Sequence, residues 1–97
     1  MPYVIVLAPE AVEDRRRLKA NVWAEVRDAL ETYLRHEPTR TSRSRIKRLR
    51  GLARPQYRLR VGEVRIFYDV TATTVEVLAI VAKSEAQSWL AQLGRPG

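Results

Sequence analysis

The chain has 97 residues, no cysteine and a formal net charge of +7 at pH 7. A chain of this length has room for one modest core, so we expect residues 1–97 to form a single domain. Without cysteine the protein has no disulfide, thiol nucleophile or thiolate metal site. The longest apolar run, residues 77–82, is too short to span a bilayer, and we therefore expect a cytoplasmic protein without a membrane partner.

The positive charge is concentrated in the middle third of the chain. Residues 35–65 contain eleven basic and two acidic residues, whereas the rest of the chain contains seven basic and nine acidic residues. Such a concentration is typical of a surface that binds a phosphate backbone or a strongly acidic protein. The alternative is a solvated surface that only keeps the protein in solution.

The first half of the chain predicts one strand and two helices. Residues 3–8 are rich in β-branched side chains, and Pro9 followed by acidic residues is typical of a helix start. A second helix should begin near Asn21 and end before Pro38. Its apolar stripe repeats every four residues and consists of Val22, Val26, Leu30 and Leu34. Residues 39–44 alternate hydroxyl side chains with arginines and should form a solvated loop.

The second half predicts an antiparallel meander and a last helix. Strands are expected over residues 56–61, 64–70 and 74–83, and a helix from Glu85 to about Leu93. Gly62-Glu63 suits a type II′ turn, which sets Val61 opposite Val64. The expected fold is α+β in the order β-α-α-β-β-β-α. Two N-terminal helices would pack on one face of an antiparallel meander sheet, followed by a short C-terminal helix.

This register places several arginines side by side. Arg60 lies opposite Arg65 and Arg58 opposite Phe67, on the face away from the apolar one. Two unit charges about 5 Å apart repel by about 3 kcal/mol at an effective dielectric near 20, so an idle sheet would not favour this arrangement. Guanidinium groups match phosphate geometry, and Phe67 among them could stack a base of single-stranded RNA. The alternative is a solvated face whose arginines pair with carboxylates of the first helix, Asp69 or Glu76.

Three motifs stand in the same order as the predicted elements. They are KRLRGL at residues 47–52, YRLRVGEVRIFYDV at 57–70 and VEVLAIV at 75–81. With the order of elements, they resemble the RelE/ParE superfamily of bacterial toxins from type II toxin–antitoxin pairs, over nearly the whole chain. The resemblance implies an acidic antitoxin as partner. For RelE-like members it implies an endoribonuclease that cleaves messenger RNA in the ribosome and so inhibits translation.

The resemblance also implies roles for individual residues. RNA cleavage needs a base for the ribose 2′-OH, cations for the phosphate and an acid for the leaving oxygen. The basic hairpin residues of the family match Arg58, Arg60 and Arg65, and its basic residue after the last strand matches Lys83. These four residues are the predicted catalytic set. The predicted RNA-binding residues are Lys47, Arg48, Arg50, Phe67 and Trp89, of which Trp89 matches the C-terminal aromatic residue of the family.

The chain departs from the family in its proton carriers. Arg58 and Arg60 stand where relatives have lysine, and arginine can clamp phosphate but cannot act as the base. Trp89 has only an indole N–H, and packing with its neighbours on the last helix is the alternative to stacking a base. His36, the single histidine, is far in sequence from the hairpin. Lys83 is the favoured base because nearby arginines disfavour its charged form.

These departures leave two alternatives to an RNA-cleaving toxin. One is a ParE-like inhibitor that binds DNA gyrase, which the missing histidine, tyrosine and lysines favour. The short pair of N-terminal helices favours the RelE-like reading instead. The other alternative is a non-catalytic relative that only binds RNA or an antitoxin. We expect no metal and no cofactor, because no cluster of His, Asp and Glu has ligand spacing.

Overall fold

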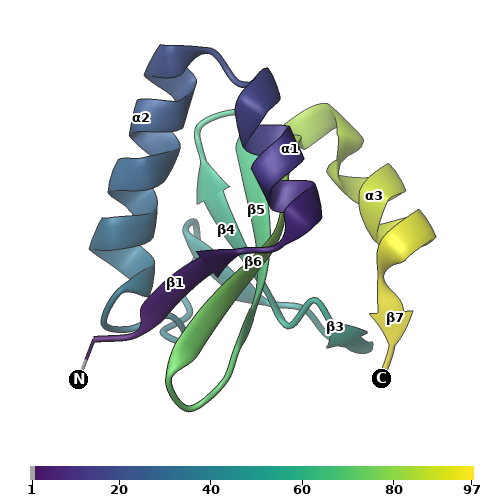
Figure 1. Cartoon of the computed structure of the whole chain (residues 1–97). Helices are drawn as coiled ribbons and strands as arrows, with labels where there is room; N and C mark the ends of the chain where they lie inside the picture. Colours follow the sequence, from purple (N-terminus) through teal and green to yellow (C-terminus); the bar gives the residue numbers. More distant parts are fainter. Residues whose placement is uncertain (1) are drawn as a thin grey trace.

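The computed structural model describes residues 2–97, and its centre is a five-stranded sheet with strand order β1-β6-β5-β4-β2 (Figure 1). These strands are β1 (Val4–Leu7), β2 (Ile46–Arg48), β4 (Tyr57–Val61), β5 (Val64–Val70) and β6 (Thr74–Ala82). A second, two-stranded sheet pairs β3 (Leu52–Arg54) with β7 (Arg95–Pro96). The helices are α1 (Pro9–Arg17), α2 (Ala20–Ala29) with its π-helical continuation η1 (Leu30–Leu34), and α3 (Ala86–Leu93), which follows the 3-10 turn η2 (Lys83–Glu85). None of the helices within residues 2–97 is long and apolar enough to cross a membrane.

The predicted hairpin and its register are confirmed. Val61 pairs with Val64, Arg60 with Arg65 and Arg58 with Phe67. Gly62 has φ +55°, and no residue other than glycine among residues 2–97 has a positive φ. Glycine therefore supplies the positive φ that a type II′ turn requires at its first loop position.

The sheet differs from a pure antiparallel meander at both edges. β4, β5 and β6 form the expected meander, but β1 pairs parallel to β6, with Val4 opposite Thr74 and Leu7 opposite Val77. The strand β2 extends the other edge by pairing antiparallel to β4. β2, β3 and β7 were not expected because each has three residues or fewer, too few to show an alternating pattern.

The helices divide between the two faces of the sheet. As predicted, α1, α2 and η1 cover one face, where Val26, Leu34, Ile66 and Tyr68 belong to one buried cluster. Because side chains alternate along β5, Phe67 points to the opposite face. Trp89 of α3 stacks on Phe67 there, with ring centroids 4.8 Å apart and 4° between the planes. The last helix thus covers the part of the opposite face around Phe67.

The edge of β6 is closed by a helix where β1 ends. The pairing of β1 with β6 stops at Val77, and α1 then lies beside the rest of the strand. Asp14 of α1 accepts a hydrogen bond from the backbone N–H of Ile80 at 2.9 Å. A carboxylate therefore satisfies a strand donor that would otherwise lack a partner.

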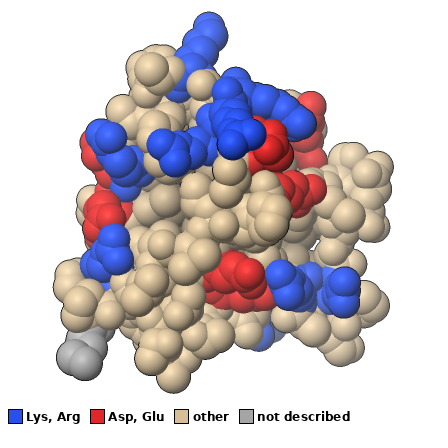
Figure 2. All heavy atoms as spheres, in the orientation of Figure 1, with Lys and Arg blue, Asp and Glu red and all other residues tan. Residues whose placement is uncertain are grey.

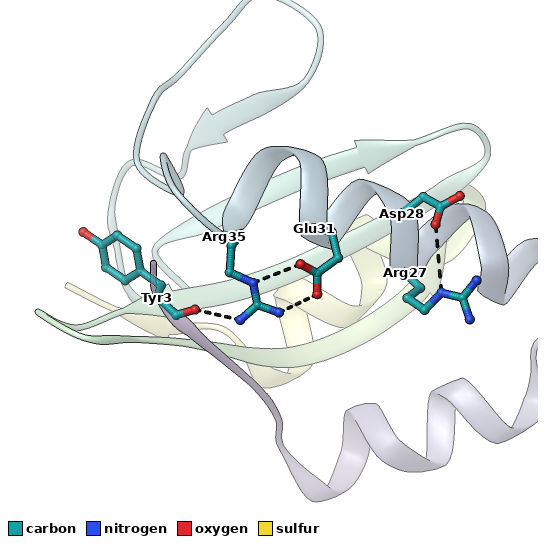
Figure 3. A network of polar contacts seen from close by, with 5 residues as sticks. All are labelled: Tyr3, Arg27, Asp28, Glu31 and Arg35. Carbon is teal, nitrogen blue, oxygen red and sulfur yellow. Dashed lines mark hydrogen bonds and ion pairs between the residues drawn. The ribbon is translucent and has the colours of Figure 1, made fainter. Parts of the chain in front are cut away.

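An arginine network joins the end of the second helix to the start of β1 (Figure 3). The backbone N–H of Tyr3 donates to the carbonyl of Arg35 at 2.7 Å, and the Arg35 guanidinium donates back to the carbonyl of Tyr3 at 2.8 Å. Arg35 also donates to both carboxylate oxygens of Glu31. These hydrogen bonds lower the pKa of the Glu31 carboxyl group. They orient Arg35 toward the first strand.

Candidate nucleic-acid interface

The sheet face opposite α1 and α2 carries basic side chains from three neighbouring strands. Lys47 of β2 pairs with Arg58 of β4, and Arg60 of β4 pairs with Arg65 of β5. Residues directly opposite one another on paired strands point to the same side of the sheet. We call Lys47, Arg58, Arg60 and Arg65 the cationic face.

Arg58 lies at the centre of the cationic face and is half-buried. Burial, followed by repulsion from Arg65 and Arg60, lowers the pKa of its guanidinium group. Its Nε atom is buried and has no hydrogen-bond partner among residues 2–97. A buried donor without an acceptor is unfavourable, so an anion that reached Arg58 would gain both a charge partner and a hydrogen bond.

The three hairpin arginines are not equally accessible. Arg60 is exposed, whereas Arg65 is only 7% exposed. The Nη1 atom of Arg65 donates to the carbonyls of Gly62 at 2.9 Å and Val64 at 3.0 Å, so this side chain also fastens the hairpin turn. The difference in exposure follows from the strands that carry the two residues. Arg65 lies on β5, which is paired on both sides, whereas Arg60 lies beyond the last residue of β4 that is paired with the short β2.

The carboxylates that were expected as alternative partners of the arginines are occupied elsewhere. Arg54 of β3 binds Asp69 and Glu76, with its Nε 3.5 Å from an Asp69 oxygen and its Nη2 3.3 Å from a Glu76 oxygen. In the first helix, Glu13 pairs with Arg16 and Asp14 with Arg17. Within the described part of the chain, no ion pair of 4.0 Å or less involves Arg58, Arg60 or Arg65. The expected pairing of the hairpin arginines with these carboxylates is therefore wrong, whereas a solvated face without a ligand stays an alternative. No sequence pattern identified Arg54, because the strand that positions it has only three residues.

The aromatic residues of this region pack against each other. Phe67 is fully buried beneath Trp89, so the expectation that its ring is exposed for stacking a base is wrong. Alternation placed Phe67 among the arginines, but only the folding of α3 onto the sheet decided that its ring is covered. Trp89 is half-buried and its indole N–H donates to Glu10 at 3.3 Å, as expected of the packing alternative.

The remaining predicted residues lie around the cationic face. Arg48 pairs with Tyr57 and lies over its ring at 5.2 Å, which places it on the opposite side of the sheet from Lys47. Arg50 is exposed in the turn between β2 and β3. Lys83 is exposed in η2, and its backbone N–H donates to the Glu63 carbonyl at 2.7 Å, beside the hairpin turn. Arg48 is thus separated from the face, whereas Lys83 borders it.

The side chains on the cationic face cannot assemble a metal site. All four are basic, and among residues 2–97 no group of three His, Asp or Glu side chains is arranged to hold an ion. His36 is exposed just after η1, in the segment that packs on the other side of the sheet. The arrangement can hold a polyanion through guanidinium and ammonium groups.

A second basic group lies on the helices and differs from the cationic face in its pairing. Figure 2 shows Lys and Arg side chains gathered over the end where α1 meets α2. There, Arg16 pairs with Glu13 at 3.0 Å, and the Arg15 guanidinium lies 4.4 Å from the centre of the Trp23 ring. These contacts are those of an ordinary solvated helix surface. The hairpin arginines lack such partners.

The sequence model described as "ParE toxin of type II toxin-antitoxin system, parDE" matches residues 5–87. The chain belongs to this family of type II toxins. The membership confirms the RelE/ParE resemblance of the hairpin and its flanking strands. No curated protein is similar enough in sequence to match this ParE-family chain.

Solved structures with the same fold include several toxin–antitoxin complexes. The complex RelBE2 from Mycobacterium tuberculosis superposes with a TM-score of 0.69 at 26% identity, covering 84% of this chain and 99% of that one. The RelB-RelE complex from Methanococcus jannaschii gives 0.67 at 18% identity, covering 87% and 96%. The RelE-RelB complex from Pyrococcus horikoshii gives 0.63 at 24% identity, covering 86% and 97%. The last two matches bear on the fold alone, and together the three confirm the predicted α+β class.

Proposed function

We propose that this type II toxin acts on RNA, by cleaving messenger RNA at the ribosome and so stopping translation. The observation that carries the proposal is the cationic face, whose three hairpin arginines have no carboxylate partner among residues 2–97 while the nearby acids bind Arg54. A phosphate backbone supplies regularly spaced anions to such a surface. The half-buried Arg58 guanidinium, which has no ion-pair partner among residues 2–97, is then a donor for a phosphate oxygen.

The residues of the cationic face and Lys83 beside it have different roles in the proposed cleavage. Arg58 and Arg60 hold the scissile phosphate and stabilise the charge that develops on it. Arg65 supports the hairpin and adds positive charge from beneath. Because arginine keeps its proton, the groups left to take the proton of the 2′-OH and to supply one to the leaving 5′-oxygen are the amines of Lys47 and Lys83 and the carboxyl group of Glu85. Attack by the 2′-OH on the phosphodiester needs no metal.

The partner proposed for this toxin is an acidic antitoxin, in the cytoplasm. The three similar structures are complexes of a toxin with its antitoxin. A net charge of +7 favours an acidic polypeptide that covers the basic surface. A flexible acidic chain that folds on binding could cover both the cationic face and its edge.

Inhibition of DNA gyrase is a second candidate function. Two observations favour it: the family model that matches is that of ParE toxins, and the cationic face contains no histidine, tyrosine or carboxylate to carry a proton. A gyrase inhibitor needs the basic surface only for binding.

End mapping distinguishes the two functions. Purified chain is incubated with ribosomes and messenger RNA, the new 5′ ends are mapped, and gyrase-mediated DNA cleavage is assayed in parallel. The exposed Arg60 is changed to Gln, which should reduce RNA cleavage about 100-fold. Arg27→Gln, an exposed arginine of α2, is the matched control and should cleave normally. Intact transcripts together with accumulated gyrase–DNA cleavage complexes would select the second candidate. If the chain caused neither RNA cleavage nor gyrase–DNA cleavage complexes, both candidate functions would be refuted.

A further inference from the structure

A cavity of about 240 Å³ lies at the junction of the second helix, the basic loop and β2. We call it the edge cavity. Its walls include Thr32 and Tyr33 of η1, Glu37, Arg40 and Thr41 of the following loop, and Arg45 just before β2. The loop is the arginine- and hydroxyl-rich segment that the cationic face does not use.

The edge cavity combines cations with free hydrogen-bonding groups. The Arg45 guanidinium lies 4.8 Å from the centre of the Tyr33 ring, and Arg40 pairs with Glu37 at 3.2 Å. In the described part of the chain, the side-chain hydroxyls of the cavity other than Ser42 make no hydrogen bond; they belong to Thr32, Tyr33 and Thr41. The cavity thus offers guanidinium donors, hydroxyl groups and one carboxylate acceptor.

The size of the edge cavity restricts its ligand. Sites for whole small molecules usually enclose about 300–1,000 Å³, more than the 240 Å³ found here. One unit of a polymer therefore fits the cavity better than a complete cofactor.

The edge cavity is connected to the cationic face through Arg45. Besides lining the edge cavity, Arg45 lines a second hollow of about 330 Å³ together with Arg60 and Gly62. Its Nη1 donates to the carbonyl of Arg60 at 3.1 Å, and the Arg60 N–H donates to the carbonyl of Arg45 at 2.9 Å. Positive charge therefore continues from the cationic face around the sheet edge into the cavity.

We propose that the edge cavity binds one nucleotide of a single-stranded RNA whose neighbouring segment lies on the cationic face. This inference rests on the proposed action on RNA. Arg45 and Arg40 contact the phosphate, and Glu37 accepts a hydrogen bond from the ribose 2′-OH or from an amino group of the base. Glu37 also distinguishes the ligand class, since a nucleotide can donate a hydrogen bond to its carboxylate whereas an acidic peptide side chain has no donor for it.

Binding of labelled RNA in the absence of ribosomes tests the proposal. Affinities are measured by fluorescence anisotropy for a 12-nucleotide and a 4-nucleotide single-stranded RNA, the shorter one being long enough for the cationic face alone. Arg45→Gln should weaken binding of the longer RNA about tenfold and leave the shorter one unchanged. For the longer RNA, it should also reduce the slope of the logarithm of the binding constant against the logarithm of the salt concentration by about 0.7. Arg27→Gln is the control and should bind both RNAs as the unaltered chain does.

A second variant reports on the acceptor in the cavity. The unaltered chain should bind the 12-nucleotide RNA more tightly than DNA of the same sequence, and Glu37→Gln should reduce this difference. Unchanged binding of the longer RNA by Arg45→Gln, or an equal loss for both lengths, would overturn the proposal. The proposal would also be overturned if Arg45→Gln lost as much affinity for an acidic 12-residue peptide as for the longer RNA, because the cavity would then be a general anion site.

The same measurements separate this inference from the proposed function. If Arg60→Gln weakens both RNAs while Arg45→Gln weakens neither, the cavity proposal fails and the cationic face stands. If Arg45→Gln weakens the longer RNA while Arg60→Gln has no effect, the cavity stands and the proposed role of the cationic face fails. Melting curves of each variant show that the fold is retained.

Discussion

Changing Tyr68 to Phe removes one hydroxyl group from the core at the start of the basic loop. Tyr68 is fully buried, and its hydroxyl donates to the carbonyl of Pro38 at 2.6 Å. Because Pro38 is also fully buried, the variant would leave this carbonyl without a partner. An unsatisfied buried polar group costs about 1–3 kcal/mol. We therefore expect the free energy of unfolding to fall by about 2 kcal/mol and the melting temperature by roughly 10 °C.

Urea unfolding of Tyr68→Phe, with Tyr57→Phe as the control, measures this loss. Tyr57 stacks on Tyr68 with ring centroids 5.5 Å apart, and its own hydroxyl makes no hydrogen bond to residues 2–97. Tyr57→Phe keeps the stack, so its free energy of unfolding should change by less than about 0.5 kcal/mol. The slope of the free energy of unfolding against urea concentration should be the same for both variants, since neither substitution changes the area exposed on unfolding. Equal stability of the two variants would refute the reasoning.

Four further predictions concern pH, the hairpin, the sheet edge and the last helix. Burial raises the pKa of Tyr68. As the pH rises, the unfolded chain, in which tyrosine ionises at about pH 10, therefore loses this proton before the folded chain does. The free energy of unfolding should therefore fall above pH 10 by up to about 1.4 kcal/mol per pH unit. Urea unfolding measured at several pH values should show this contribution in the unaltered chain and not in Tyr68→Phe. Arg65→Ala should lower the free energy of unfolding by about 1–3 kcal/mol in the same assay, since two turn carbonyls lose their donor; no change would remove its structural role. Asp14→Ala should cost about 2 kcal/mol, whereas Asp14→Asn keeps an acceptor for Ile80 and should cost clearly less; equal losses would contradict the edge contact. Trp89→Phe should keep an aromatic ring stacked on Phe67, as near-UV circular dichroism would report, and should lower the free energy of unfolding by less than about 1 kcal/mol. A larger decrease would show that the exposed hydrogen bond from the indole N–H to Glu10 contributes more than its length of 3.3 Å suggests.

The prediction for Arg65 changes how the hairpin can be tested. From the sequence, the three arginines are equivalent members of the predicted catalytic set. In the structure Arg65 is buried and bonded to the turn, so loss of activity in its variants could reflect a weakened hairpin. Arg60 is exposed and is the more informative position for function.

Local patterns were sufficient for the hairpin and for the order of most elements. Two-residue alternation assigned each side chain of β4 and β5 to a face, and Gly62 in the turn set the pairing of Arg60 with Arg65. The same alternation separated Ile66 from Phe67 correctly. These features depend on backbone geometry within about fifteen residues, which the sequence displays directly.

The accessibility of each site residue depended on segments distant in sequence. Phe67 is covered because α3 returns to the sheet, and the carboxylates near the arginines are taken by Arg54 of β3, a strand of three residues without a readable pattern. Thus the sequence by itself determined that arginines gather on one sheet face and which family the hairpin resembles. Only the tertiary structure decided which arginine is buried, that all three lack an acidic partner among residues 2–97 and where the basic loop forms a cavity. The physical reason is that alternation is set by neighbouring peptide units, whereas burial and charge pairing are set by whatever the rest of the chain brings alongside.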